Sequence, residues 1–216
     1  MPRRPRIASK GTCELCKSTV GKSGMTKHLQ ACLEKAKSDG KLIKRSSPSL
    51  KFFHLLVEGR DLPEYWMHLK VSSHARFQDL DNFLREIWLE CCGHLSAFVI
   101  GTEEVKKGKK LEYVLRPGMQ LTHEYDFGST TELTLKVVSE FESNIKTGEV
   151  EVLARNDPPQ IKCSYCDHLA TTICTECFYE DAGWLCNDCA EDHECGEDML
   201  LPVVNSPRTG VCGYTG

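Results

Sequence analysis

The chain has 216 residues, of which 40% are hydrophobic and 27% charged, a balance typical of a globular protein rather than a disordered one. No apolar run approaches the roughly 18 residues of a membrane helix, and no apolar stretch follows the basic start, which argues against a membrane span and a secretory signal. We therefore expect a cytoplasmic protein. In that reducing compartment its 13 cysteines would serve metal binding or chemistry rather than disulfides.

Charge divides the chain unevenly. Residues 1–51 hold 13 Lys/Arg against 3 Asp/Glu, a net charge of +10, and the remainder holds 14 against 28, a net charge of −14. From Cys163 to the end, 10 acidic residues are opposed by Arg208 alone. A basic head on an acidic body predicts that only the head approaches a polyanion.

Composition also predicts the domain organisation. We expect a basic C2HC-type zinc finger at 1–40, a linker at 41–49, an α+β domain at 50–157 and an acidic double-zinc module at 160–216. The prolines that end the segment 156–159 mark the last boundary.

The basic N-terminal segment contains one set of potential zinc ligands. Cys13-x2-Cys16 places two thiolates on a tight turn, and Ser23 can cap a following helix. His28 and Cys32 stand four apart, on one face of that helix. The spacing C-x2-C-x11-H-x3-C suits one tetrahedral zinc. The alternatives are a redox C-x-x-C, which lacks its usual strand–helix–strand context, and unrelated cysteines in a basic tail.

The same segment predicts a nucleic-acid contact, because clustered cations bind phosphates with little sequence choice. RNA, a ribosomal surface and DNA are equally compatible, and a solvated basic tail is the alternative. The residues expected to contact phosphates are Arg3, Arg4, Arg6, Lys10, Lys17, Lys22 and Lys27.

The middle segment carries strand and helix patterns in chain order. Apolar positions spaced by three or four predict an amphipathic helix over 76–92. Short apolar or alternating runs predict strands at 52–57, 65–71, 95–100, 121–125, 133–138 and 149–153. The expected fold is α+β, a mostly antiparallel sheet with one amphipathic helix.

The acidic C-terminal segment gives the strongest signal. C-x2-C pairs begin at Cys163, Cys174 and Cys186, and His193 and Cys195 follow. Six thiolates exceed the capacity of one ion, and short spacers favour an interleaved arrangement of two zincs. One zinc would be bound by Cys163, Cys166, Cys186 and Cys189. The other would be bound by Cys174, Cys177, His193 and one more ligand. We prefer Cys195 for that position, with Cys212 and then His168 as the alternatives.

The spacing over residues 163–195 resembles the B-box family of cross-braced zinc modules. That resemblance implies a protein-interaction role, and the acidic charge agrees with it. A segment of this size with few large apolar residues could hardly fold unaided, so the zincs would be structural. With the N-terminal site, we expect about three zinc ions in the chain.

Residues 50–216 resemble the plasmid ORF-three-like family, also labelled transposon-passenger proteins. The likeness rests on residues 65–71, on Ile87-Trp88 with the following Gly93-His94-Leu95 and Phe98, on residues 123–128 and on the closing run 201–214. The resemblance implies an α+β fold and no settled activity.

The chain departs from that family after Gly128. The family tends to have an acidic residue, then tryptophan and histidine, where this chain has the residues 129–133. His94, His123, Glu124 and Asp126 could form an acid–base or metal cluster, but we favour a turn-forming role for Asp126 and strand-end positions for the histidines.

Three functions remain open from the sequence. The first is a zinc-binding adaptor that associates with nucleic acid through its basic finger and with a protein through its acidic module. The second is a protein-interaction scaffold without nucleic acid. The third is an enzyme of unknown reaction that uses the His123–Asp126 region.

Overall fold

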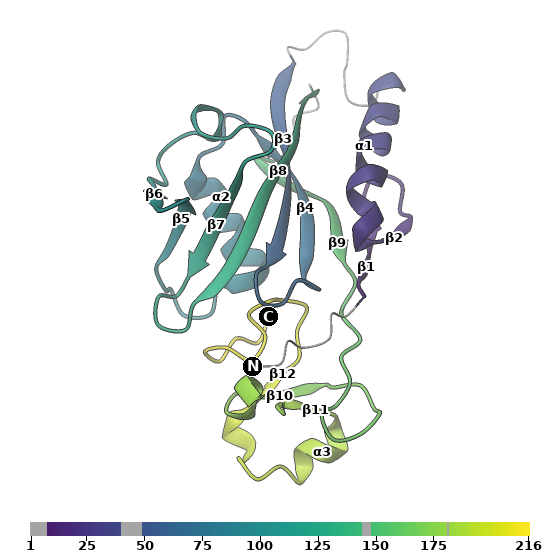
Figure 1. Ribbon diagram of the computed structural model, residues 1–216, viewed down its shortest axis with the longest axis vertical. Helices are drawn as coiled ribbons and strands as arrows, with labels where there is room; N and C mark the ends of the chain where they lie inside the picture. Colours follow the sequence, from purple (N-terminus) through teal and green to yellow (C-terminus); the bar gives the residue numbers. More distant parts are fainter. Residues whose placement is uncertain (1–7, 40–48, 144–147, 181) are drawn as a thin grey trace.

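The structure is a computed structural model that describes residues 8–39, 49–143, 148–180 and 182–216. Within these residues a nine-stranded sheet forms the main body, and every neighbouring pair of strands is antiparallel. Its strands, in order across the sheet (Figure 1), are β2 (Thr19–Gly21), β1 (Lys10–Cys13), β9 (Val150–Asn156), β4 (Trp66–Ser72), β3 (Leu50–Gly59), β8 (Thr131–Ser143), β7 (Gln120–Tyr125), β5 (Ser96–Ile100) and β6 (Glu103–Val105). The predicted antiparallel α+β character is confirmed.

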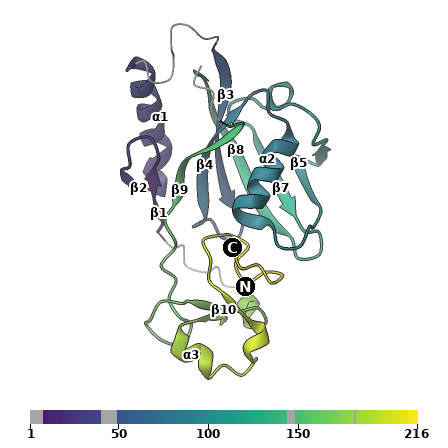
Figure 2. The same ribbon diagram turned by 180° about the vertical axis from the view of Figure 1, so that it is seen from behind.

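The main core lies between this sheet and α2 (Phe77–Leu84), which crosses one face (Figure 2). Side chains alternate along a strand, so Leu55 and Val57 of β3 face α2, whereas His54 and Leu56 face the opposite side. The core cluster contains 22 buried residues, which gives the body a large apolar interior of its own.

The predicted helix over 76–92 is shorter and less regular than expected. The α-helix ends at Leu84 and continues as a π-helical segment, η1 (Arg85–Leu89), where the Glu90 amide bonds to the Arg85 carbonyl at 2.8 Å. The single π turn still brings Trp88 into the core. A short 3₁₀ turn, η2 (Leu111–Tyr113), lies between β6 and β7.

The N-terminal segment forms the edge of the main sheet, because β1 pairs with β9. Helix α1 (Lys22–Ser38) follows, with Gly21 as its N-cap and no side-chain cap, so the expected Ser23 cap is wrong. The apolar face of α1 packs in a second buried cluster with Trp66 and Leu56 of the sheet.

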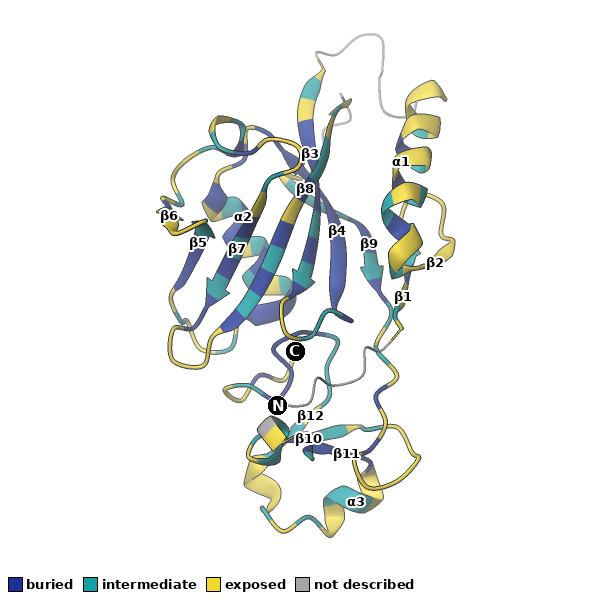
Figure 3. Cartoon of the chain, in the orientation of Figure 1, coloured by how far each residue is buried: buried dark blue, intermediate teal, exposed yellow. Residues whose placement is uncertain are grey.

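The C-terminal segment begins as a small separate unit below the sheet (Figure 1). Its elements are β10 (Thr172–Cys174), η3 (Cys177–Glu180), β11 (Trp184–Leu185), α3 (Asn187–Glu191), η4 (Glu197–Met199) and β12 (Leu200–Pro202). The strands form a three-stranded antiparallel sheet. Its buried cluster holds Ile161, Ile173 and Trp184, and most of the unit is exposed or half-buried (Figure 3).

After β12 the chain returns to the main body. The Ser206 hydroxyl donates to the Trp88 carbonyl at 2.6 Å, and the Arg208 guanidinium donates to the Asp126 carboxylate at 2.8 Å. The closing residues 203–216, here called the C-terminal tail, therefore contact both parts: Val203 packs against the core of the small unit, and Ser206 and Arg208 bond to the main body.

Candidate metal sites

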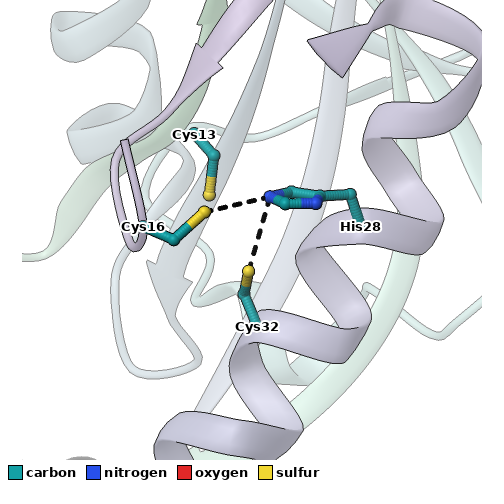
Figure 4. Close-up of side chains that lie close together, drawn as sticks. All are labelled: Cys13, Cys16, His28 and Cys32. Carbon is teal, nitrogen blue, oxygen red and sulfur yellow. Dashed lines mark hydrogen bonds between the residues drawn. The ribbon is translucent and has the colours of Figure 1, made fainter. Parts of the chain in front are cut away.

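The N-terminal ligands converge on one point (Figure 4). Cys13 ends β1, Cys16 lies in the turn before β2, and His28 and Cys32 project from successive turns of α1. The Nε2 atom of His28 lies 3.2 Å from the Cys16 sulfur and 3.4 Å from the Cys32 sulfur. All four ligand atoms lie within 4.8 Å of one another. The predicted set is therefore assembled in three dimensions.

The fold fixes this cluster at the sheet edge. The turn closes because the Cys13 amide bonds to the Ser18 carbonyl at 2.9 Å and the Lys17 amide bonds to the Cys13 carbonyl at 2.7 Å. Close pairing of β1 with β9 requires Gly11, because a Cβ there would lie 2.2 Å from the Arg155 carbonyl oxygen. Strand and helix thus carry the four ligands on elements that are themselves packed.

The first C-terminal cluster joins the first and third C-x2-C pairs. The Cys166 sulfur lies 3.6 Å from that of Cys186 and 3.9 Å from that of Cys189, and Cys163 completes the group. His168 and Asp188 also lie near Cys186, but both are exposed and Cys186 already belongs to this cluster.

The second C-terminal cluster joins the middle pair to the residues after α3. The Cys177 sulfur lies 3.5 Å from the Nε2 atom of His193 and 3.6 Å from the sulfur of Cys195, and Cys174 completes the group. The structure thus interleaves the two clusters and places Cys195, not Cys212, beside His193.

These spacings match the edges of a zinc tetrahedron. With Zn–S of about 2.3 Å and Zn–N of about 2.0–2.1 Å, sulfurs lie about 3.8 Å apart and a sulfur and a nitrogen about 3.5 Å apart. The separations given above for the three clusters are 3.6–3.9 Å between sulfurs and 3.2–3.5 Å between sulfur and nitrogen. All 13 cysteines, which lie within the described ranges, are free thiols.

The pKa values of neighbouring thiols in these clusters are shifted in opposite directions, as expected where several thiols lie close together. A hydrogen bond with the Ser18 side chain lowers the pKa of Cys16 to about 6, and burial together with neighbouring thiols raises the pKa of Cys32 to about 12. In the C-terminal unit, hydrogen bonds with Cys186 and Cys163 raise the pKa of Cys189 to about 12. One thiolate forms readily, a second beside it is unfavourable, and a divalent cation between them removes that repulsion.

The three cysteines outside these clusters form a fourth group with His94. Cys91, Cys92, His94 and Cys212 bring their ligand atoms within 4.8 Å of one another. The signal was present in the count: ten cysteines fill the three predicted clusters, and three of the 13 remain. Spacing could not reveal the group, because Cys212 lies 120 positions after Cys92.

The other polar candidates of the middle domain do not form one cluster. His123 lies within β7 rather than at its end and is fully buried, and its Nε2 lies 2.7 Å from the Asp81 carboxylate. Asp126 accepts a bond from the Gly128 amide at 3.0 Å, as the turn interpretation expects, and pairs with Arg208. His123 and Asp126 therefore belong to separate networks.

The described basic residues differ in their availability. Lys10 and Lys27 are exposed, Lys17 pairs with Glu14, and Lys22 pairs with Glu58. The remaining candidates, Arg3, Arg4 and Arg6, lie outside the described residues.

Comparison with known proteins gives little further guidance. No family model and no curated protein matches the chain. Among solved structures, the crystal structure of the protein of unknown function MM3350 from Methanosarcina mazei Go1 is similar over 49% of this chain and 69% of that one, with 17% identity and a TM-score of 0.44. This likeness is too weak to assign a function. No helix in the described ranges is long and apolar enough to cross a membrane.

Proposed function

We propose that this protein is a zinc-binding adaptor with one structural zinc in each of the three predicted clusters. The observation that carries the proposal is the C-terminal unit, where eight ligands form two interleaved clusters beside a small core. Among the described residues of that core, Ile161, Ile173 and Trp184 are buried, and the apolar residues packed against them are only partly buried. A core of that size cannot offset the entropy of ordering the unit, whereas a structural zinc contributes about 10–16 kcal/mol apparent near neutral pH. Four protein ligands leave no open position for catalysis.

Metal analysis tests this directly. Protein purified without added metal should contain at least three zinc ions per chain by plasma mass spectrometry. A ratio of one or below, or iron in place of zinc, would overturn the assignment.

The adaptor role includes nucleic-acid association through the basic N-terminal segment. Exposed Lys10 and Lys27 and the N-terminal arginines support it, whereas the carboxylates beside Lys17 and Lys22 reduce the contribution of those two. At most five phosphate contacts then remain, so the log–log salt slope should be no steeper than about −4.5 on duplex or −3.5 on single strands.

Fluorescence anisotropy with labelled RNA and DNA across a salt series measures that slope. Lys27→Ala should weaken binding and flatten the duplex slope by about 0.9, whereas the matched variant Lys17→Ala should change it less. The triple replacement of Arg3, Arg4 and Arg6 by Ala should have the largest effect. Unchanged binding in the triple variant, or none by the full chain at low salt, would favour the scaffold without nucleic acid.

The acidic C-terminal unit would contact a protein partner. A groove of about 600 Å³ is bordered by Asp188, Asp192 and Glu194 and by the exposed Tyr165, which supports a basic segment as the ligand. The four-part domain division, the plasmid ORF-three-like resemblance and a cytoplasmic location remain parts of this proposal. Nothing in the described residues favours the enzyme alternative, because His123 and Asp126 lie in separate networks.

A further inference from the structure

The fourth Cys/His group joins two distant parts of the chain. Cys91 and Cys92 follow the π-helical segment η1, and His94 lies two residues before β5 begins. Cys212 comes from the C-terminal tail, which reaches the group only after the chain has passed through the small unit. Any ion held here would therefore connect the main body to the tail.

The ligand atoms have the spacing of a four-coordinate site. The sulfur of Cys92 lies 3.7 Å from that of Cys91 and 3.9 Å from that of Cys212. The Nε2 atom of His94 lies 3.0 Å from the Cys92 sulfur and 3.3 Å from the Cys212 sulfur. The sulfur–sulfur separations match the tetrahedral edge of about 3.8 Å expected around zinc, and the sulfur–nitrogen separations are somewhat shorter than the expected edge of about 3.5 Å. Three thiols and one imidazole are also a ligand set that zinc favours.

The backbone on both sides is shaped to present these side chains. On the body side, Glu90 accepts hydrogen bonds from the Gly93 amide at 2.6 Å and from the Tyr125 hydroxyl at 3.0 Å, which holds the loop that carries Cys91 and Cys92. On the tail side, Cys212 has a φ of 52°, a left-handed conformation that residues other than glycine rarely adopt. Such a conformation persists where the surroundings determine it, and a metal bond would do so.

A buried arginine, Arg208, is hydrogen-bonded to one of the four potential ligands. Arg208 is fully buried and donates to the Cys91 sulfur at 3.4 Å as well as to Asp126 and, at 2.9 Å, to the Thr131 hydroxyl. The guanidinium charge of Arg208 would offset the negative charge of a thiolate at Cys91, as hydrogen-bonded groups behind metal ligands commonly do.

We propose that Cys91, Cys92, His94 and Cys212 bind a further zinc ion, which clasps the C-terminal tail to the main sheet. With this site, all 13 cysteines and three histidines fill four sets of four ligands with no cysteine left over. The proposal goes beyond the adaptor function, because it concerns neither the N-terminal segment nor the acidic unit.

Differential alkylation of the full chain tests the site separately from the other three. Cys92 and Cys212 are exposed, so without a metal they should react rapidly with N-ethylmaleimide. We expect the peptides that contain Cys91, Cys92 and Cys212 to be protected in zinc-loaded protein and labelled after chelation. Rapid labelling of these peptides, while the peptides of the other clusters stay protected, would overturn the proposal.

Native mass spectrometry counts the ions. The full chain should carry four zincs, and Cys212→Ser should carry three. Cys212→His, which keeps a zinc ligand, and Thr215→Ala, an exposed neighbour with no ligand, should both keep four. Three zincs in the unaltered chain, or four in Cys212→Ser, would contradict the proposal. If Cys212→Ser lost more than one ion through unfolding, the alkylation pattern of the unaltered chain would decide.

Discussion

The main sheet and the small C-terminal unit differ in how many apolar residues they bury. The sheet buries 22 residues in one apolar cluster, whereas the cluster of the small unit holds three. The small unit also brings together two clusters of potential zinc ligands. We therefore expect metal removal to destabilise the small unit and truncation of an apolar core residue to destabilise the main sheet.

The N-terminal segment lies between these extremes. Its ligand cluster sits beside a real, if small, apolar interface, where Met25, Leu29 and Leu33 of α1 pack against Trp66. Its first strand is also paired with β9. We therefore expect zinc to stabilise the fold of this segment without being essential for it, whereas the C-terminal unit should need zinc in order to fold.

The largest expected effect comes from removing the metal. Chelation of the full chain should unfold the C-terminal unit, since each structural zinc contributes about 10–16 kcal/mol apparent to its folding, and should leave the main sheet folded. Hydrogen exchange followed by mass spectrometry would show loss of protection in residues 160–203 with protection retained in β3, β4 and β8. Protection retained in both regions would show that the small unit does not depend on metal.

Removing one ligand should act nearly as strongly on the same unit. Cys186→Ser opens the first C-terminal cluster, and the second should follow because the ligand pairs alternate along the chain. Limited proteolysis should then cut beyond Pro159 and spare the sheet. Glu194→Gln, an exposed non-ligand between His193 and Cys195, is the matched control and should stay resistant. Cleavage throughout the chain would mean that the sheet depends on the small unit.

Much of the fold could be predicted from the sequence, because local pattern determines it. Each of the six expected strands of the middle segment is present, since alternating or short apolar runs define them. What pattern could not show is pairing across long separations. That β1 joins β9, and that the C-terminal tail packs on the sheet through Ser206 and Arg208, depends on tertiary contacts.

The same distinction between local pattern and distant contacts separates the ligand sets that the sequence predicts from the one that it does not. C-x2-C pairs with short spacers carry their partners within a few tens of residues, so the interleaved clusters were predictable and the structure assembles those residues. Cys91 and Cys92 have no such spacing, and the spacing of Cys212 suggests a role only in the second C-terminal cluster. The sequence groups His94 with His123 and Asp126. In the structure His94 lies 3.5 Å from Asp126 but is separate from His123, and its shortest contacts are with Cys92 and Cys212.

Truncation of a core residue should destabilise the main sheet and spare the small unit, the opposite of the first two predictions. Leu69 is fully buried beneath α2, and Leu69→Ala should lower the free energy of unfolding of the main sheet by about 2–5 kcal/mol. Zinc content should not change. Tyr113→Ala, at a residue that is 71% exposed, is the control and should stay within about 0.5 kcal/mol. Urea denaturation with parallel metal analysis makes the measurement, and zinc loss in Leu69→Ala would show that the two regions are coupled.

The smallest effect concerns acid, and it distinguishes the sheet from the zinc clusters. His54 and His68 are buried side by side, with 2.8 Å between Nε2 of the first and Nδ1 of the second. Burial lowers the pKa of His54 to about 4, and burial with the neighbouring His54 lowers the pKa of His68 to about 3. Both side chains stay neutral in the folded chain, whereas in the unfolded chain they bind protons below about pH 6.5. The contribution of this pair to the free energy of unfolding is therefore fully present above that pH and decreases as the pH falls toward the folded-state pKa values.

Between pH 7 and pH 6 the pair should cost the sheet about 1 kcal/mol. Zinc ligands also take up protons in acid, but that response belongs to the metal clusters and should be unaffected by this pair. Replacing both residues by leucine should remove the difference in the unfolding free energy of the sheet between these pH values and leave acid-induced zinc release unchanged. His74→Gln, whose side chain is 52% exposed, should leave the pH dependence as it is. An identical pH dependence in the double variant would show that other groups carry it.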